Sequence, residues 1–373
     1  MTGANASNKA STGYAREMYD THKWGMPLVA ISCPQCKNSH LVPLKSVPER
    51  CPFCRHAPIS AGDTGPALAP PEQVIPYTLS EGKLTGILDR WAQGVRFRPD
   101  GMDPGLLAQR AQRYMVPMWL VDSRVQGSWQ AEMGFDYRLR SYEDQYSDMA
   151  GWASQQVQET KVRWEPRAGE IGRAYDNVAT AALEDHRRVM RRLGSYKLDE
   201  RIGYEPEHVE NAAVRIPTRA PDAAWPDAKA ALNQLSKLEC TQASAADHVR
   251  GFELDAQYGD TTWTQLLLPA YVTWYAEGDN TWPVVINGQN GHVDGMRRAS
   301  ARKAGVTSLI IGIVAAVLVI LGGILTLAGA VFPPGAVVGI ILLIIGVILG
   351  LTAPIPAVSV WAHNRNASLA NWL

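Results

Sequence analysis

The chain has 373 residues, with 36 acidic and 36 basic side chains and a pI near 7.1. This balance argues against a generic nucleic-acid-binding domain, which would usually carry a strong positive excess. Outside the apolar C-terminal segment described below, about 300 residues remain, enough for one large or two modest domains with hydrophobic cores.

Residues 1–25 begin with a stretch rich in Ser, Asn, Ala and Gly, which predicts a disordered tail. The first 23 residues lack the apolar run of a secretory signal. Nothing in this segment therefore argues for export of the N-terminal part.

Four cysteines form two CxxC pairs separated by 14 residues: Cys33, Cys36, Cys51 and Cys54. Four thiolates at this spacing predict a tetrahedral Zn²⁺ site in a zinc ribbon over residues 26–60. Disulfides, which are rare in the cytoplasm, and a redox pair, which needs only one CxxC, are the alternatives. A four-cysteine site has no open position, so the zinc is expected to be structural. His40 and His56 are nearby spare ligands, and Cys240 is expected to be a buried apolar residue.

A linker at 61–73 leads to a middle region at 74–295. Helical spacing of apolar residues predicts helices at 80–94, from Pro104, at 178–193 and at 223–238. Apolar runs predict strands at 115–121, 129–139, 266–275 and 282–286, with Gly127 between the first two and Asn-Gly turns at 287–288 and 290–291. Strands interspersed with helices indicate an α+β fold.

Two strand segments, 116–119 and 268–271, share an apolar–Pro–x–aromatic order. Both a duplicated strand pair and coincidence account for so short a pattern. Each proline is expected at the start or edge of its strand because it cannot donate to a ladder.

The helix predicted to end near residue 193 carries a basic face formed by His186, Arg187, Arg188, Arg191 and Arg192. A solvated face balanced by Glu184 and Asp185 is the default interpretation. Contact with anionic lipid and contact with an acidic protein partner are the alternatives.

Residues 306–362 contain no Asp, Glu, Lys or Arg. We expect two transmembrane helices, 306–331 and 335–360, joined by a turn where Pro333, Pro334 and Gly335 interrupt the helix. A buried hairpin in a soluble core is the alternative. Basic residues in the juxtamembrane segment 296–305 and in the tail 361–373 predict, by the positive-inside tendency, that both ends face the cytoplasm at the cell membrane.

Glycines recur on one stripe of the second predicted span: Gly335, Gly339, Gly346 and Gly350. Such a stripe allows close approach between helices. It indicates either packing of the two spans against each other or oligomerisation of hairpins.

Taken together, four features resemble a bacterial family of zinc-ribbon-containing integral membrane proteins: the CPxC…CPxC ribbon, VPMWLVDSRVQGSW at 116–129, LLPAYVTWYAEG…TWPVVINGQNGHVDG at 267–295, and the apolar spans. The chain is similar to actinobacterial members associated with contractile injection system gene clusters. The resemblance implies no established reaction. It implies a membrane docking factor for a cytoplasmic injection particle.

The sequence contains no phosphate loop, dinucleotide fingerprint, HExxH or GxSxG motif, so we do not expect an enzyme. His186, His208 and His248 are scattered, each with acidic neighbours. The leading prediction is a membrane-anchored cytoplasmic adaptor that docks a protein partner or particle. The alternatives are a pore-forming effector made of oligomerised hairpins and a membrane-tethered nucleic-acid-binding regulator that uses the few basic residues of the ribbon.

Overall fold

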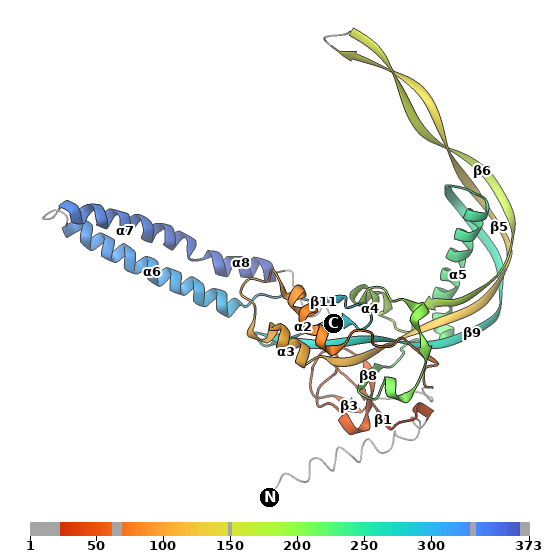
Figure 1. Ribbon diagram of the computed structural model, residues 1–373, viewed down its shortest axis with the longest axis horizontal. Helices are drawn as coiled ribbons and strands as arrows, with labels where there is room; N and C mark the ends of the chain where they lie inside the picture. Colours follow the sequence, from red (N-terminus) through yellow and green to blue (C-terminus); the bar gives the residue numbers. More distant parts are fainter. Residues whose placement is uncertain (1–22, 62–68, 148–150, 329–332, 366–373) are drawn as a thin grey trace, which may run out of the picture.

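The computed structural model describes residues 23–61, 69–147, 151–328 and 333–365. A body at the centre carries two projections, an apolar helical hairpin and a long curved β-arm (Figure 1). Most of the predicted N-terminal tail and linker, part of the turn between the two spans, and the last eight residues lie outside the described residues.

One mixed sheet of 11 strands runs through the body in the order β11-β10-β9-β5-β8-β2-β1-β3, with β4, β6 and β7 off this path. Helices and strands alternate along the chain, in agreement with the predicted mixed α and β content. The strands are β1 (Leu28–Ser32), β2 (Ser39–Pro43), β3 (Ser60–Ala61), β4 (Gln73–Val74), β5 (Gln112–Ser147), β6 (Gly151–Thr180), β7 (Ile202–Gly203), β8 (Ala212–Arg215), β9 (His248–Glu277), β10 (Asn280–Asn287) and β11 (Val293–Gly295).

The two similar segments of the sequence are neighbours at the centre of this sheet. Strands β5 and β9 are antiparallel, with Val116 opposite Leu268 and Pro117 opposite Leu267. The prediction that each proline starts or edges its strand is wrong. On its other side, β5 pairs with β8 up to Met115 and with β6 from Trp119, so Pro117 occupies the gap between two partners. A missing donor is tolerated there because no ladder partner faces it.

The β-arm is made of residues 123–147 of β5, 151–176 of β6 and 248–263 of β9. Strands β5 and β6 stay in antiparallel register from Trp119 opposite Thr180 to Ser147 opposite Gly151. Strand β9 accompanies them only as far as Gly134 opposite His248, so the outer part, which we call the arm tip (135–147 and 151–163), has two strands. The two strands predicted at 115–121 and 129–139 are therefore one strand.

Gly127 does not interrupt that strand. A Cβ placed on Gly127 would lie 2.0 Å from the carbonyl oxygen of Asp255 on β9. Glycine is required here because the backbone of β9 passes too close for any side chain, and not because the chain turns.

The two faces of the sheet in the body are covered by different helices. Tyr271 and Tyr275 of β9 pack with α2 (Glu81–Ala92) and α3 (Pro104–Gln109), both near their predicted positions. The alternate residues Leu266, Leu268, Ala270 and Val272 face an apolar cluster that includes Leu193 of α4 (His186–Leu193). This alternation follows from the two-residue period of a strand.

Helix α5 (Pro221–Ala243), which covers the predicted helix at 223–238, lies along the inner part of the arm (Figure 1). Its buried residues recur every fourth position: Ala224, Ala228, Leu232, Ser236 and Cys240. They are small or apolar, so the helix sits close to the strands that carry Val125 and Tyr258. The helix predicted at 178–193 is wrong in its first part, because residues up to Thr180 pair with β5 and only 186–193 are helical.

The apolar C-terminal segment forms two helices long and apolar enough to cross a membrane, as predicted. These are α6 (Ala301–Ala328) and α7 (Pro333–Thr352), and α8 (Ile355–Asn364) continues α7 after a break at Pro354. Their large apolar side chains point outward: Leu327 is 80% exposed and Leu351 is 74% exposed. A helix of a soluble core would bury such residues, so the exposure supports a lipid-facing hairpin.

Three of the hairpin glycines face the partner helix within the same hairpin. A Cβ on Gly322 would lie 2.7 Å from the backbone nitrogen of Leu343, and one on Gly339 would lie 2.5 Å from that of Thr326. Gly346 would meet Val319 in the same way, at 2.9 Å from its backbone nitrogen. These three glycines therefore serve the packing of α6 against α7.

The base of the hairpin is fixed to the body by hydrogen bonds. Asn364 exchanges two side-chain bonds with the backbone of Ala299, and His363 bonds the carbonyl of Arg297 at 2.7 Å. The Lys303 ammonium pairs with Asp100 at 2.5 Å. Because both ends of the hairpin attach to the body, the body lies at the open end of the hairpin.

Candidate functional site

The two CxxC segments fold into two turns of the same design. In the first, the backbone nitrogen of Cys33 donates to the carbonyl of Asn38 and Lys37 donates back to Cys33. In the second, the backbone nitrogen of Cys51 donates to the carbonyl of His56, and that of Arg55 donates back to the carbonyl of Cys51. Lys37 and Arg55 both adopt left-handed backbone angles, with φ of 59° and 63°. Each turn thereby directs its two cysteine side chains toward the same point.

The four sulfur atoms lie within 4.8 Å of one another. The Cys33 and Cys54 sulfurs are 3.5 Å apart, and those of Cys36 and Cys51 are 3.7 Å apart. A tetrahedral site with Zn–S bonds of about 2.3 Å requires sulfur separations of about 3.8 Å. All four cysteines are free of disulfides. The cluster therefore fits a metal ion bound by four thiolates.

The sulfurs also interact in a way that favours a thiolate. A hydrogen bond from the Cys36 thiol lowers the pKa of Cys51 and raises that of Cys36 itself. A bound cation would extend this effect to the whole set, because metal ligands must be deprotonated. With all four cysteines as ligands, the ion would brace the two turns and would keep no open position for a substrate.

Among the described residues, the others considered as ligands do not belong to this group of four close side chains. His40 is fully buried, and its Nε2 atom forms a hydrogen bond of 2.9 Å with the Tyr114 hydroxyl. His56 is exposed. Cys240 is buried on α5, in agreement with its predicted role as an apolar residue.

The cysteine cluster belongs to the core of the body. Strand β2 pairs with β8, which joins the ribbon strands to the main sheet. Cys33, Cys51 and Cys54 share one apolar cluster with Leu193, against which Val189 and Met190 of α4 also pack. The two cysteine turns and the inner face of the basic helix therefore lie on the same face of the sheet.

A buried arginine connects the first turn to α4. Arg215, at the end of β8, is 4% exposed and donates to the Asn38 side chain at 2.7 Å and to Asp185 at 2.8 Å. Asn38 follows the first CxxC turn, and Asp185 immediately precedes α4. Asp185 thus pairs directly with Arg215, and its charge also acts favourably on Arg192 of α4.

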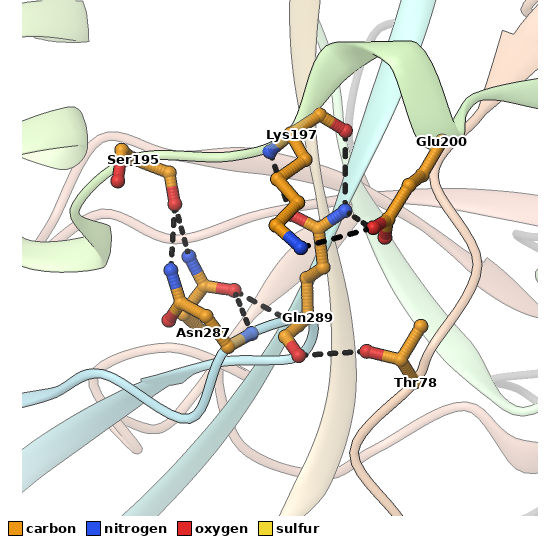
Figure 2. Close-up of polar contacts among 7 residues, drawn as sticks. Thr78, Ser195, Lys197, Glu200, Asn287 and Gln289 are labelled. Carbon is orange, nitrogen blue, oxygen red and sulfur yellow. Dashed lines mark hydrogen bonds and ion pairs between the residues drawn. The ribbon is translucent and has the colours of Figure 1, made fainter.

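The other end of α4 is held by the loop at 287–291. The buried Asn287 side chain donates to the carbonyls of Leu193 and Ser195, as Figure 2 shows for Ser195. Gln289 exchanges side-chain bonds with the backbone of Lys197 and reaches Glu200, while its own carbonyl accepts from Thr78 at 2.6 Å. The two Asn-Gly pairs lie in the connection between the antiparallel strands β10 and β11, as predicted for a hairpin, and this loop also holds the segment after α4 in place.

The three histidines considered for catalysis have separate local roles. His248 pairs with Asp136 on the arm at 2.8 Å. His208 accepts a hydrogen bond from the backbone of Glu205. His186 starts α4. Among the described residues, these side chains do not form a shared catalytic arrangement.

Sequence reasoning found the cysteines and the basic helix but not the residues that join them. Asn38, Arg215 and Asp185 come from three distant parts of the chain, and no local spacing relates them. The NGQNG segment predicts turns and forms part of the family resemblance, but its spacing does not indicate a contact with α4. The sequence offers one signal: an arginine stands among apolar residues in 212–216. A charge inside an apolar strand requires a partner.

Comparison of the chain with protein-family models, curated proteins and solved structures finds no match.

Proposed function

We propose that the protein is a membrane-anchored cytoplasmic adaptor. The hairpin α6–α7 holds it in the cell membrane, a structural zinc ion braces the cysteine turns, and the β-arm docks a protein partner or particle. The observation that carries the proposal is the arm tip, a two-stranded ribbon that extends far from the body (Figure 1). It carries exposed aromatic side chains.

The arm tip has the composition of a protein-binding surface. Tyr137, Leu139 and Tyr142 are exposed large hydrophobic residues on strand β5. Tyrosine is enriched at protein interfaces because it supplies apolar area together with a polar group. A two-stranded ribbon is marginally stable in water by itself, so a partner that covers this surface would also stabilise it.

The open edge of β6 argues for a different protein as partner rather than another copy pairing edge to edge. This edge strand carries Pro166 and alternates Lys161, Arg163, Glu165 and Arg167 with other residues. Proline and charged side chains on an edge strand oppose the addition of a further strand. The partner is therefore expected to contact the faces of the ribbon or the edge of β5 that β9 leaves open beyond Gly134.

The cytoplasmic orientation rests on the basic residues before α6, including Arg302 and Lys303, and on the attachment of both hairpin ends to the body. Both termini are then on the cytoplasmic side. The family resemblance makes a contractile injection particle the first partner to test.

The proposal is tested by removing part of the arm tip. Residues 138–160 are replaced by Asn-Gly, a turn that suits the facing pair Tyr137 and Lys161. The contact between Asp136 and His248 that ends the three-stranded part is kept. The variant and the wild type are purified from host membranes and compared by quantitative mass spectrometry. We expect the variant to lose the partner while it keeps its membrane insertion; retention of every partner would overturn the proposal.

Neither alternative function gains an observation of its own. The glycines at 322, 339 and 346 serve the packing inside one hairpin. In the zinc ribbon, the guanidinium of Arg55 lies over the ring of Trp274 at 4.0 Å. This cation, one of the few that could contact nucleic acid, therefore already has a contact within the chain.

A further inference from the structure

A large groove lies between α4 and the start of α5. Its volume is about 880 Å³, within the range of small-molecule sites. The groove is lined by the end of β6 and the residues after it, by α4, by Arg219 and by α5. Five arginines line it, together with His186: Arg187, Arg188, Arg191, Arg192 and Arg219.

The acidic residues of the groove are mostly engaged with particular cations. Arg219 pairs with Asp227 on α5, Arg192 lies 3.8 Å from Asp294, and Asp185 binds Arg215. Among the described residues, Arg187, Arg188 and Arg191 have no such carboxylate partner, and all three are exposed. They follow one another within little more than one helical turn, which concentrates three positive charges in a small volume.

The lining also contains polar atoms without a hydrogen-bond partner. The Thr180 side chain is 6% exposed and its hydroxyl oxygen is unpaired, as is the Nδ1 atom of His186. Buried polar groups normally have partners, and both residues line the groove. This observation is independent of the arginine cluster.

The backbone around the groove is fixed. Thr218 and Arg219 donate to the carbonyl of Ala182, and Glu184 donates to the Thr218 hydroxyl at 2.9 Å. Asn287 holds the end of α4, and Asp185 is held before its first residue. Arginines on such a preorganised support lose less conformational freedom when they bind a ligand.

We propose that this groove binds a compact anion with two or more phosphoryl groups. Guanidinium groups match phosphate oxygens with paired hydrogen bonds. Glu184, Asp227 and Asp294 flank the arginines and would repel a long acidic peptide that continues past them. The inference does not depend on the proposed adaptor function.

A phosphoryl group could belong to a soluble molecule or to a lipid headgroup, and the position of α4 favours the soluble source. In Figure 1, α4 lies over the sheet, set back from the start of α6, with α2 and α3 nearer to the hairpin. A hairpin that spans a membrane would therefore leave the groove away from the bilayer surface.

The test is calorimetric titration of the full-length protein with pyrophosphate, in phosphatidylcholine nanodiscs at low salt. We compare the wild type with Arg187→Ala/Arg188→Ala/Arg191→Ala. The control, Arg110→Ala/Arg138→Ala/Arg140→Ala, removes the same charge from exposed arginines elsewhere. We expect the groove variant to bind at least about tenfold more weakly and the control to bind like the wild type. Equal affinity of all three proteins, or no binding to the wild type, overturns the proposal.

Three further titrations identify the chemical class of the ligand. Citrate that binds as tightly as pyrophosphate would show general affinity for anions and overturn the phosphoryl assignment. Polyglutamate that binds more tightly would assign the groove to an acidic protein segment instead. Pyrophosphate affinity that is unchanged in discs containing phosphatidylglycerol supports a soluble ligand, whereas competition by these discs assigns the groove to lipid headgroups.

Discussion

Arg215 shows how a single buried charge joins two sites that the sequence presents separately. Its guanidinium contacts the residue after the first cysteine turn and the residue before the basic helix. The cysteines were predictable because each CxxC pair sits within a single turn. The spacing of two residues in the sequence is therefore enough to indicate a pair of metal ligands. The arginine link was not predictable because it depends on which strands become neighbours in the sheet.

Zinc content tests the cysteine cluster at the residue scale. We expect one zinc ion per chain by elemental analysis of the purified protein. Cys36→Ser should lose the metal and lower the melting temperature by roughly 10 °C, because structural metal binding contributes directly to folding.

Cys240→Ala is the matched control, since it removes the fifth cysteine and should keep the zinc. A wild-type protein without metal but with disulfides between these cysteines would contradict the assignment.

His40 predicts a dependence of stability on pH. Burial lowers the pKa of His40 to about 4 from its ordinary value of 6.5. Between pH 6.5 and 4, His40 is therefore protonated in the unfolded chain but neutral in the folded chain. The free energy of unfolding falls as the pH falls across this range. The full effect corresponds to about 3 kcal/mol.

The control for this effect is His40→Gln, which keeps a polar group near the Tyr114 hydroxyl but cannot gain the proton. Chemical unfolding at several pH values should give a smaller slope for the variant across this range. Identical slopes would show that His40 does not contribute.

At the scale of elements, helices were easier to predict than strands. The apolar residues of a helix recur at helical spacing within the helix itself, and this pattern predicts α2, α3 and α5. Strand β5 extends over 36 residues, yet Pro117 and Gly127 look like interruptions in the sequence. Pro117 is tolerated because no strand pairs with it on one side, and Gly127 is required because β9 passes close to it. Neither the gap nor the close approach can be predicted from the local sequence pattern.

The hairpin glycines give a test at the same scale. Gly339→Leu should push α6 and α7 apart, because even a Cβ at this position meets the backbone of Thr326. We expect a loss of about 1–3 kcal/mol, seen as a lower melting temperature in detergent. Gly312→Leu is the control, since nothing lies within 4 Å of a Cβ there.

Unchanged stability of Gly339→Leu together with a smaller particle in light scattering would contradict this interpretation. That result would place the glycine stripe at an interface between hairpins.

At the scale of the whole molecule, the sequence predicted the apolar hairpin but not the arm. Two long uncharged segments carry their own evidence, since few structures other than membrane spans have this composition. Polar and apolar residues alternate along the strands of the arm, so its sequence resembles that of ordinary short strands until its pairing is known. The molecule therefore extends from the hairpin base to the arm tip through one continuous sheet (Figure 1).

The direct contacts between these parts support the adaptor proposal. Lys303, Asn364 and Tyr275 bind the hairpin base to the body by direct contacts. A partner held at the arm tip would then be kept at a defined distance and direction from the membrane, which a flexible linker could not provide.

The most direct measurement is photo-crosslinking at the arm tip in living host cells. A benzophenone amino acid replaces Tyr137, which is 45% exposed, and in a control replaces Ile202 of β7, which is 43% exposed. We predict a discrete adduct between the position-137 variant and a different protein, with no such adduct from position 202. Adducts formed only with a second copy of the chain, or equal labelling from both positions, would contradict the adaptor function.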